Sequence, residues 1–230
     1  GSPGRRRWQL YKHVLPKARG SNEVERLLAE HPPRGVREFS IGISAFGRSK
    51  DWRRALSLLD KMLTAGVTPN LVSFNSAISA CAKGGQWKQA LSLLVAMRKV
   101  GVTPDVISFN SAMAACAKGG QWQRALSLLE EMRAAGLEPD TISFNAVISA
   151  CEKGGKWSRA LSLLDEMRGA NLAPNVVSFN AAISACAKDG QWEPALSLLV
   201  AMQKAGIAAD DISFNSAISA CAKGGHWERA

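Results

Sequence analysis

Apolar positions along this chain follow the spacing of amphipathic helices. Within residues 71–105, one apolar face contains Phe74, Ala77, Ile78 and Cys81. Steps of three and four residues predict a first helix in this segment. We expect Ser73 to cap the start of the helix and Lys83 to close it.

A second helix is expected after the turn at Gly84-Gly85, because glycine favours the backbone conformation that ends a helix. Its apolar face contains Trp87, Ala90, Leu91, Leu94 and Met97. Gly101 ends this second helix, and Pro104 prevents its continuation. The segment therefore predicts two antiparallel helices, and no part of the chain shows the alternation of a strand.

This two-helix unit recurs every 35 residues. The phenylalanines at this step are Phe39, Phe74, Phe109, Phe144, Phe179 and Phe214, and the tryptophans are Trp52, Trp87, Trp122, Trp157, Trp192 and Trp227. The methionines are Met62, Met97, Met132, Met167 and Met202. One helix pair is too small to bury both its apolar faces, so the period predicts a solenoid with these side chains in its core.

Full units are expected at 36–70, 71–105, 106–140, 141–175 and 176–210, followed by 20 residues of a sixth at 211–230. Either the array continues beyond that point, or something else completes the last helix pair. Residues 1–35 form a basic N-terminal arm, of which the first 20 residues are irregular. Within it, SNEVERLLAEHP predicts a short end-capping helix that begins at Ser21 or Asn22.

The net charge of +10 is unevenly distributed along the chain. Residues 1–70 contain 14 Lys or Arg against 6 Asp or Glu, whereas residues 71–230 contain 15 against 13. An argument for a nucleic-acid partner must therefore rest on where the cations lie rather than on their number. The chain has no run of 18 apolar residues, so no membrane-spanning segment is expected.

The five cysteines occupy one position of the unit, at Cys81, Cys116, Cys151, Cys186 and Cys221. Equivalent residues of stacked helices lie about 8–10 Å apart, which exceeds the roughly 7 Å limit for a disulfide. We expect small buried side chains in a reducing compartment. A metal or redox role is the alternative, although the chain has no Cys-x-x-Cys and no histidine at ligand spacing.

An asparagine in the first turn of each first helix does not fit the apolar pattern. It directly follows the phenylalanine at Asn75, Asn110, Asn145, Asn180 and Asn215. One explanation is a local hydrogen bond to the backbone, which asparagine often makes near helix starts. The other is a functional role for a side chain that offers both a donor and an acceptor.

The segment PDVISFNSAMAACAKGGQWQRALSLLEEMRAAGLEPD resembles a pentatricopeptide repeat. The resemblance rests on the period of 35, the Ser-Phe-Asn opening, the ALSLL…M second helix and the closing Gly-x-x-Pro-Asp, and it covers residues 36–230. The repeat style is also similar to the expanded set in dinoflagellate algae. The resemblance implies an all-α, right-handed solenoid of stacked antiparallel helix pairs that binds single-stranded RNA, one nucleotide per repeat.

In that family, the fifth and last residues of each unit read the base. Carried onto this chain, the pairs are Ser40 with Asn70, Asn75 with Asp105, Asn110 with Asp140, Asn145 with Asn175, and Asn180 with Asp210, while Asn215 would add a pyrimidine if its partner exists. The family preferences are adenine for Ser with Asn, uracil for Asn with Asp, and a pyrimidine, cytosine over uracil, for Asn with Asn. The implied target is about 5′-AUU(C/U)U-3′.

The chemistry suits these residue types, because Asp accepts from uracil N3–H whereas Asn donates to cytosine N3. By the same resemblance, a second set of residues wedges between successive bases: Val72, Ile107, Ile142, Val177 and Ile212. One wedge per step expands a stacked spacing of about 3.4 Å to about 7 Å, close to the roughly 8–10 Å between helices. Ordinary packing between helices is the alternative role for these side chains.

A cation closes every first helix, at Arg48, Lys83, Lys118, Lys153, Lys188 and Lys223. One cation per unit matches one phosphate per nucleotide, although a lysine there also complements the helix dipole. Two departures weaken the expected readout at the ends of the array. Arg37 and Phe46 replace the wedge and the cysteine of the first unit, and the proline before Asp210 is missing.

Two classes of function follow from these patterns. One is a selective RNA-binding adaptor in organellar RNA processing, stability, editing or translation. The other is a structural solenoid that holds protein in an organellar ribosome or another large assembly. We expect no cofactor and no enzyme, since no acid–base pair, metal cluster or phosphate loop is visible, although a catalytic domain could lie beyond residue 230.

The expected location is a mitochondrion or a plastid, because the resembled family acts mainly there. The Arg-rich N-terminus has three interpretations: the tail of a transit peptide, a phosphate-binding arm or, at GSPG, a remnant of cloning.

Overall fold

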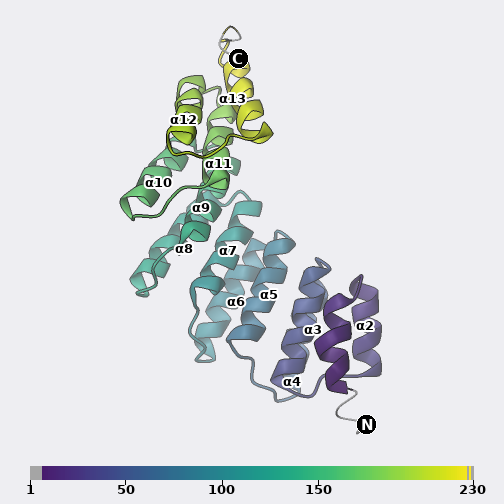
Figure 1. Ribbon diagram of the computed structural model, residues 1–230. Coiled ribbons are helices and arrows are strands. Elements are labelled where there is room, and N and C mark those ends of the chain that lie inside the picture. The colour runs from purple at the N-terminus through teal and green to yellow at the C-terminus, as the bar shows by residue number, and fades with distance from the viewer. Residues whose placement is uncertain (1–6, 227, 229–230) are drawn as a thin grey trace. The chain divides into compact units, whose positions relative to one another are not determined.

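The computed structural model describes residues 7–226 and 228, and every element in this described part of the chain is a helix (Figure 1). The chain divides into two compact halves, Gly1–Ala115 and Cys116–Ala230, which we call the N-terminal and the C-terminal half. The interpretations placed on residues 1–6 and on Trp227 lie outside the described residues.

The N-terminal half contains a capping helix followed by two helix pairs. The helices are α2 (Ser21–Glu30), α3 (Val36–Arg48), α4 (Trp52–Thr64), α5 (Leu71–Lys83) and α6 (Trp87–Lys99), and α7 (Val106–Lys118) begins in this half. The first helices α3 and α5 pack side by side, and each also contacts the second helix of its own pair. Helix α4 further contacts α5 of the next pair, so the pairs stack as predicted.

The C-terminal half repeats this arrangement. Its helices are α8 (Trp122–Ala134), α9 (Thr141–Lys153), α10 (Trp157–Gly169), α11 (Val176–Lys188), α12 (Trp192–Lys204) and α13 (Asp211–Lys223). The first helices α9, α11 and α13 form a row, and each second helix packs against the first helix that follows it. The all-α fold of stacked helix pairs is therefore confirmed.

The repeated apolar residues form the core of both halves. The repeated phenylalanines Phe39, Phe74, Phe109, Phe144 and Phe179 are at most 3% exposed, and the methionines from Met62 to Met202 are fully buried. The apolar face of the second helix differs slightly from the prediction: Leu93 is buried, whereas Leu91, which was predicted on that face, is only half-buried. Phe214 is the exception among the phenylalanines at 53% exposed, since no second helix of its unit lies among the described residues.

The glycine pair between the helices has two separate roles. Gly85 adopts a φ of 68°, a left-handed conformation that other residues rarely take. Gly84 has an ordinary φ but lies against the ring of Trp52 from the preceding unit, where an added Cβ would come within 2.4 Å of the ring atom Cδ1. Gly154 lies in the same way against Trp122. The half-buried tryptophans Trp52 and Trp122 thus pack against the turn of the unit that follows each of them.

The N-terminal arm is more ordered than the sequence indicated. Residues 10–17 form a π-helical turn (Leu10–Val14) and a 3-10 turn (Leu15–Lys17), and both pack against α3. Tyr11 is fully buried and donates its hydroxyl proton to the carbonyl oxygen of His31 over 2.6 Å. The prediction of an irregular arm is therefore wrong for this stretch, because buried apolar side chains order it.

The predicted cap of helix α2 is also wrong. The N-cap residue is Gly20, and no side chain caps the helix. Ser21 instead donates to the carboxylate of Asp51 over 2.5 Å and accepts from Arg54, which ties α2 to the start of α4. The backbone N–H of Arg19 is satisfied by Glu23 at 2.7 Å.

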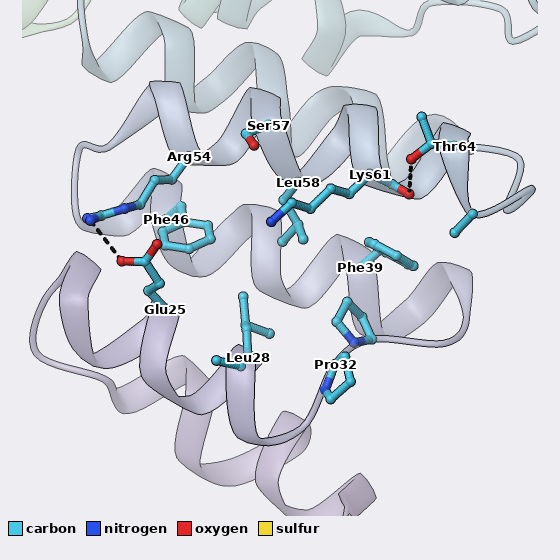
Figure 2. A pocket seen from close by; sticks show the side chains of 13 residues that line it. Glu25, Leu28, Pro32, Phe39, Phe46, Arg54, Ser57, Leu58, Lys61 and Thr64 are labelled. Carbon is cyan, nitrogen blue, oxygen red and sulfur yellow. Dashed lines mark hydrogen bonds and ion pairs between the residues drawn. The ribbon is translucent and has the colours of Figure 1, made fainter.

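A cavity of about 600 Å³ lies between α2, α3 and α4 (Figure 2). Phe39, Phe46 and Leu58 form its apolar wall, and an ion pair between Arg54 and Glu25 with atoms 2.8 Å apart lies at its edge. In three later units, a second-helix arginine from the preceding unit lies over the equivalent phenylalanine: Arg98 over Phe109, Arg133 over Phe144 and Arg168 over Phe179, at 5.5–5.7 Å.

Candidate nucleic-acid interface

The last residue of each unit caps the first helix of the next unit. Asn70 accepts the backbone N–H of Ser73 over 3.0 Å, and the Ser73 side chain accepts the backbone N–H of Asn70 in return, which makes a reciprocal capping box. The helices α9, α11 and α13 begin with the same box at Asp140, Asn175 and Asp210. The prediction that Ser73 is the N-cap is therefore wrong: Asn70 is the N-cap, and Ser73 is the third helical residue.

The fifth and last residues of a unit meet at this cap. In the N-terminal half, the amide nitrogen Nδ2 of Asn75 donates to the Asp105 carboxylate oxygen Oδ1 over 3.0 Å. The hydroxyl oxygen of Ser108 lies 2.5 Å from Asn75 Oδ1 and 2.8 Å from Asp105 Oδ1. The partners of Asn75 are thus side chains of the cap that follows, not the local backbone that was the alternative explanation.

The C-terminal half contains two further pairs with the same geometry. Asn145 donates to Asn175 Oδ1 over 3.2 Å, and Asn180 donates to both carboxylate oxygens of Asp210 over 2.9 and 3.1 Å. The hydroxyls of Ser178 and Ser213 each lie 2.5 Å from the asparagine Oδ1. Asp210 caps α13 with the same backbone angles as Asp140 caps α9, so the missing proline does not loosen this position.

These bonds determine which atoms face outward. The Oδ1 atom of each last residue is occupied by the cap, so Asp105 retains Oδ2 as an acceptor whereas Asn175 retains its Nδ2 protons as donors. The amide of Asn75 keeps its second N–H, because the first one donates to Asp105. An Asn–Asp pair thus offers a donor beside an acceptor, and an Asn–Asn pair offers donors.

The ionisation of Asp105 follows from the same contacts. Partial burial raises its pKa, but the hydrogen bonds from the Ser108 N–H and the Asn75 amide help to lower the pKa below its ordinary value. Asp210 has a lowered pKa as well, chiefly through the Ser213 N–H and the Asn180 amide. Both carboxylates are therefore ionised acceptors at neutral pH.

The predicted wedge residues are solvent-exposed. Val72, Ile107, Ile142, Val177 and Ile212 are between 58% and 64% exposed. Large apolar side chains exposed at the same position of five units do not serve ordinary packing between helices, which was the alternative. Arg37, at the equivalent position of the first unit, is exposed and lies 5.7 Å from the ring of Trp8.

A groove in the N-terminal half brings the three predicted sets of side chains together. It has a volume of about 290 Å³, and the wedges Val72 and Ile107 line it together with Asn75 and Lys83. A groove of about 340 Å³ in the C-terminal half is lined by Ile212, Asn215, Lys188 and Lys223. Asn215 is exposed there.

The predicted cations are exposed but differ in their partners. The six residues Arg48, Lys83, Lys118, Lys153, Lys188 and Lys223 are all exposed. Arg48 donates to the carbonyl oxygen of Leu15 over 3.3 Å. Lys188 forms an ion pair with Glu152, with Nζ and Oε1 2.9 Å apart, and also donates to the backbone oxygen of Glu152. Alanine occupies the position of Glu152 in the equivalent units at 82, 117, 187 and 222.

The first unit and the middle pair differ from the others. Ser40 is buried and hydrogen-bonds to the hydroxyl of Ser73 at 2.9 Å and to the Val36 carbonyl, and Ser73 in turn contacts Asn70. The short side chain of Ser40 therefore leaves more room beside Asn70 than an asparagine at position 40 would. Asn110 is 9% exposed and Asp140 caps α9, but the two belong to different halves.

Sequence reasoning missed two sets of serines. Ser108, Ser178 and Ser213 contact the fifth residue of the preceding unit. Only a capping role was predicted from the sequence at this position, for Ser73. Ser76 and Ser79 line the groove. Their recurrence at fixed positions of the unit was the signal that could have found them, together with their small polar side chains.

The cysteines behave as buried apolar residues. All five are free and buried, and burial raises the pKa of Cys81 to about 11. Across residues 7–226 and 228, no three His, Cys, Asp or Glu side chains lie close enough together to hold a metal ion. None of the helices described is both long and apolar enough to cross a membrane.

Known repeat families match most of this chain. The pentatricopeptide repeat domain matches residues 40–84, 57–121 and 127–189, which together exceed half of the sequence. The chain belongs to the pentatricopeptide repeat family. A second model, the PPR repeat family, matches residues 174–223, and a single PPR repeat matches 107–137. Among curated proteins, no sequence matches at a significant level.

Solved pentatricopeptide repeat structures are similar to this chain. PPR10 in complex with an 18-nt psaJ RNA element is 26% identical with a TM-score of 0.69, covering 97% of this chain and 31% of that chain. PPR10 from maize is 24% identical, with a TM-score of 0.63 and coverage of 86% and 28%. The PPR domain of Arabidopsis thaliana protein-only RNase P 1, in complex with tRNA, is 14% identical, with a TM-score of 0.65 and coverage of 82% and 95%. The last two show the fold alone, and this chain spans less than a third of the length of PPR10.

Proposed function

We propose that this chain reads single-stranded RNA selectively, one nucleotide per repeat, with a target of about 5′-AUU(C/U)U-3′. The observation that carries the proposal is the groove in the N-terminal half, where Val72 and Ile107 flank Asn75 and Lys83. Two exposed apolar side chains suit the two faces of a base, and a lysine at the same groove suits its phosphate. The solved complex of PPR10 with an RNA element supports the proposal.

Base selection follows from the outward atoms of each pair. Uracil carries an N3–H between two carbonyl oxygens, so Asp105 Oδ2 accepts the N3–H while the second amide proton of Asn75 donates to a carbonyl. Cytosine would turn its N3 acceptor toward the carboxylate, which is repulsive. Where Asn175 replaces the aspartate, the outward Nδ2 donates to cytosine N3. The short Ser40 leaves room for the larger adenine beside Asn70.

The biological setting belongs to the same proposal. We assign the chain an adaptor role in organellar RNA processing, stability, editing or translation, in a mitochondrion or plastid, without catalysis of its own. Stacking contributes about 1–3 kcal/mol per base before ordering costs, so five bases support an affinity near micromolar. Other proteins of an RNA-processing or ribosomal complex would add to this modest affinity.

A binding titration tests the proposal. One labelled RNA contains AUUCU, and its control contains CUUAU, which has the same composition with only the adenine and cytosine exchanged. Since each misplaced hydrogen bond costs about 0.5–1.5 kcal/mol, we expect the control to bind about tenfold more weakly. Equal, weak binding to both RNAs would contradict selective reading and favour the role of a structural solenoid that holds protein.

A further inference from the structure

The third residue of a unit lies inside the base-reading pair of the unit before it. Ser108 is fully buried, and its hydroxyl oxygen lies 2.5 Å from Asn75 Oδ1 and 2.8 Å from Asp105 Oδ1. Ser178 has the same contacts with Asn145 and Asn175 at 2.5 and 3.1 Å. The contact therefore recurs in both halves and with both kinds of last residue.

The single proton of this hydroxyl has one suitable acceptor. Asp105 Oδ1 already accepts the backbone N–H of Ser108 over 2.8 Å and the amide of Asn75 over 3.0 Å. The hydroxyl oxygen itself accepts the backbone N–H of Asp105 over 3.2 Å. The proton is thus donated to Asn75 Oδ1, which is the shorter of the two contacts.

This donation fixes the orientation of the asparagine amide. If the amide of Asn75 turned over, its oxygen would face the carboxylate of Asp105, and the hydroxyl of Ser108 would lose its acceptor. Without the hydroxyl, only the bond to Asp105 would hold the amide. A rotating amide would offer the base a donor and an acceptor in turn, which would lower the preference for one base over another.

We propose that Ser108, Ser178 and Ser213 are specificity-determining positioning residues for RNA. Each one holds the amide of the preceding unit with its N–H toward the base, so the choice of one nucleotide depends on residues from two adjacent units. The inference rests on the proposed function and deepens it. These serines do not touch the base, and they act through the asparagine.

The first unit supplies a matched control within the same chain. Ser73 occupies the same capping box as Ser108, but its neighbour is the hydroxyl of Ser40 at 2.9 Å. Replacing Ser73 removes the same hydroxyl from a cap without freeing the amide of Asn75, whose hydroxyl partner is Ser108. Ser73→Ala therefore matches Ser108→Ala in its effect on the helix start, but not in its effect on Asn75.

The test compares Ser108→Ala, Ser108→Thr and Ser73→Ala in the whole chain. The readout is the ratio of affinities for RNAs that contain AUUCU and ACUCU, which differ only at the second base. Because one hydrogen bond contributes about 0.5–1.5 kcal/mol, Ser108→Ala is expected to lower the uracil preference about three- to tenfold. Ser108→Thr keeps a hydroxyl and the preference, and Ser73→Ala keeps the preference at this base.

An NMR measurement without RNA provides a second readout. In the parent chain and in Ser73→Ala, the two side-chain amide protons of Asn75 should be well dispersed and slow to exchange, whereas Ser108→Ala should collapse this dispersion. If Ser108→Ala left both the ratio of RNA affinities and the dispersion of the Asn75 amide protons unchanged, this inference would be overturned, but the proposed function would not. A parent chain without any uracil preference would overturn the proposed function and this inference with it.

Discussion

Glu152 weakens one of the expected phosphate contacts, and its removal should strengthen RNA binding. Its carboxylate lies 2.9 Å from Lys188 Nζ, and the equivalent position is alanine in the other units compared above. A phosphate that binds Lys188 would come to about 6 Å from this carboxylate, within the roughly 10 Å screening length at 0.1 M salt. The repulsion is about 1 kcal/mol, so Glu152→Ala should tighten binding about fivefold.

The assay is an anisotropy titration of the AUUCU RNA at several salt concentrations. With Lys188 released, the slope of log K against log salt should steepen by about 0.7, the value for one additional phosphate on a single strand. Stability should change little, since an ion pair at the protein surface contributes about 0–1 kcal/mol. Glu130→Ala, on the exposed side of α8, is the control with the same change in charge. Equal affinity and equal slope in the parent and Glu152→Ala would refute this assignment of Lys188.

Three further predictions concern stability and reactivity. Gly84→Ala should lower the free energy of unfolding in urea by about 1–3 kcal/mol, because its Cβ would meet the Trp52 ring, whereas Gly169→Ala, with open space around it, should change it little. The lowered pKa of Asp105 stabilises the fold above its unfolded pKa near 3.8 and ceases to do so as the pH falls further, so unfolding of Asp105→Asn should depend less on pH between about 5 and 3 than that of the parent. With its pKa raised to about 11, Cys81 should be alkylated at pH 8 about a hundredfold more slowly in the folded chain than in urea.

The fold was largely predictable because each apolar position is repeated and none conflicts with its neighbours. The ends of the helices followed from Lys83 and the glycine turn, and the structure has them where expected. The separate reasons for the two glycines were not predictable. Gly84 is required by the ring of Trp52, which belongs to another unit, and periodicity alone does not reveal a contact between units.

The prediction for the N-terminal arm was wrong for a related reason. Its helical turns are too short to show a periodic apolar face, and they are ordered by burial of Tyr11 and Leu15 rather than by local preference. The cap of α2 was misassigned because the hydroxyl of Ser21 binds Asp51 instead of the backbone of its own helix.

The residues of the candidate site were predictable, but the hydrogen bonds between them were not. The roles of Asn75 and Asp105 were implied by the resemblance to the repeat family, whereas their direct hydrogen bond and the contact with Ser108 required the three-dimensional structure. A capping serine and a base-reading aspartate looked like separate features in the sequence. They are one network because the last residue of a unit is also the N-cap of the next helix.

The central claim is that the pair of residues in each unit selects one base. The most direct measurement exchanges one pair for another that the chain already contains, through Asn75→Ser together with Asp105→Asn. The new pair reproduces Ser40 with Asn70, and asparagine retains the cap, as Asn70 does for α5. We expect the preference at the second base to change from uracil to adenine, so that AAUCU binds better than AUUCU. A preference that stays with uracil, or equal binding to both RNAs, would contradict reading by repeats.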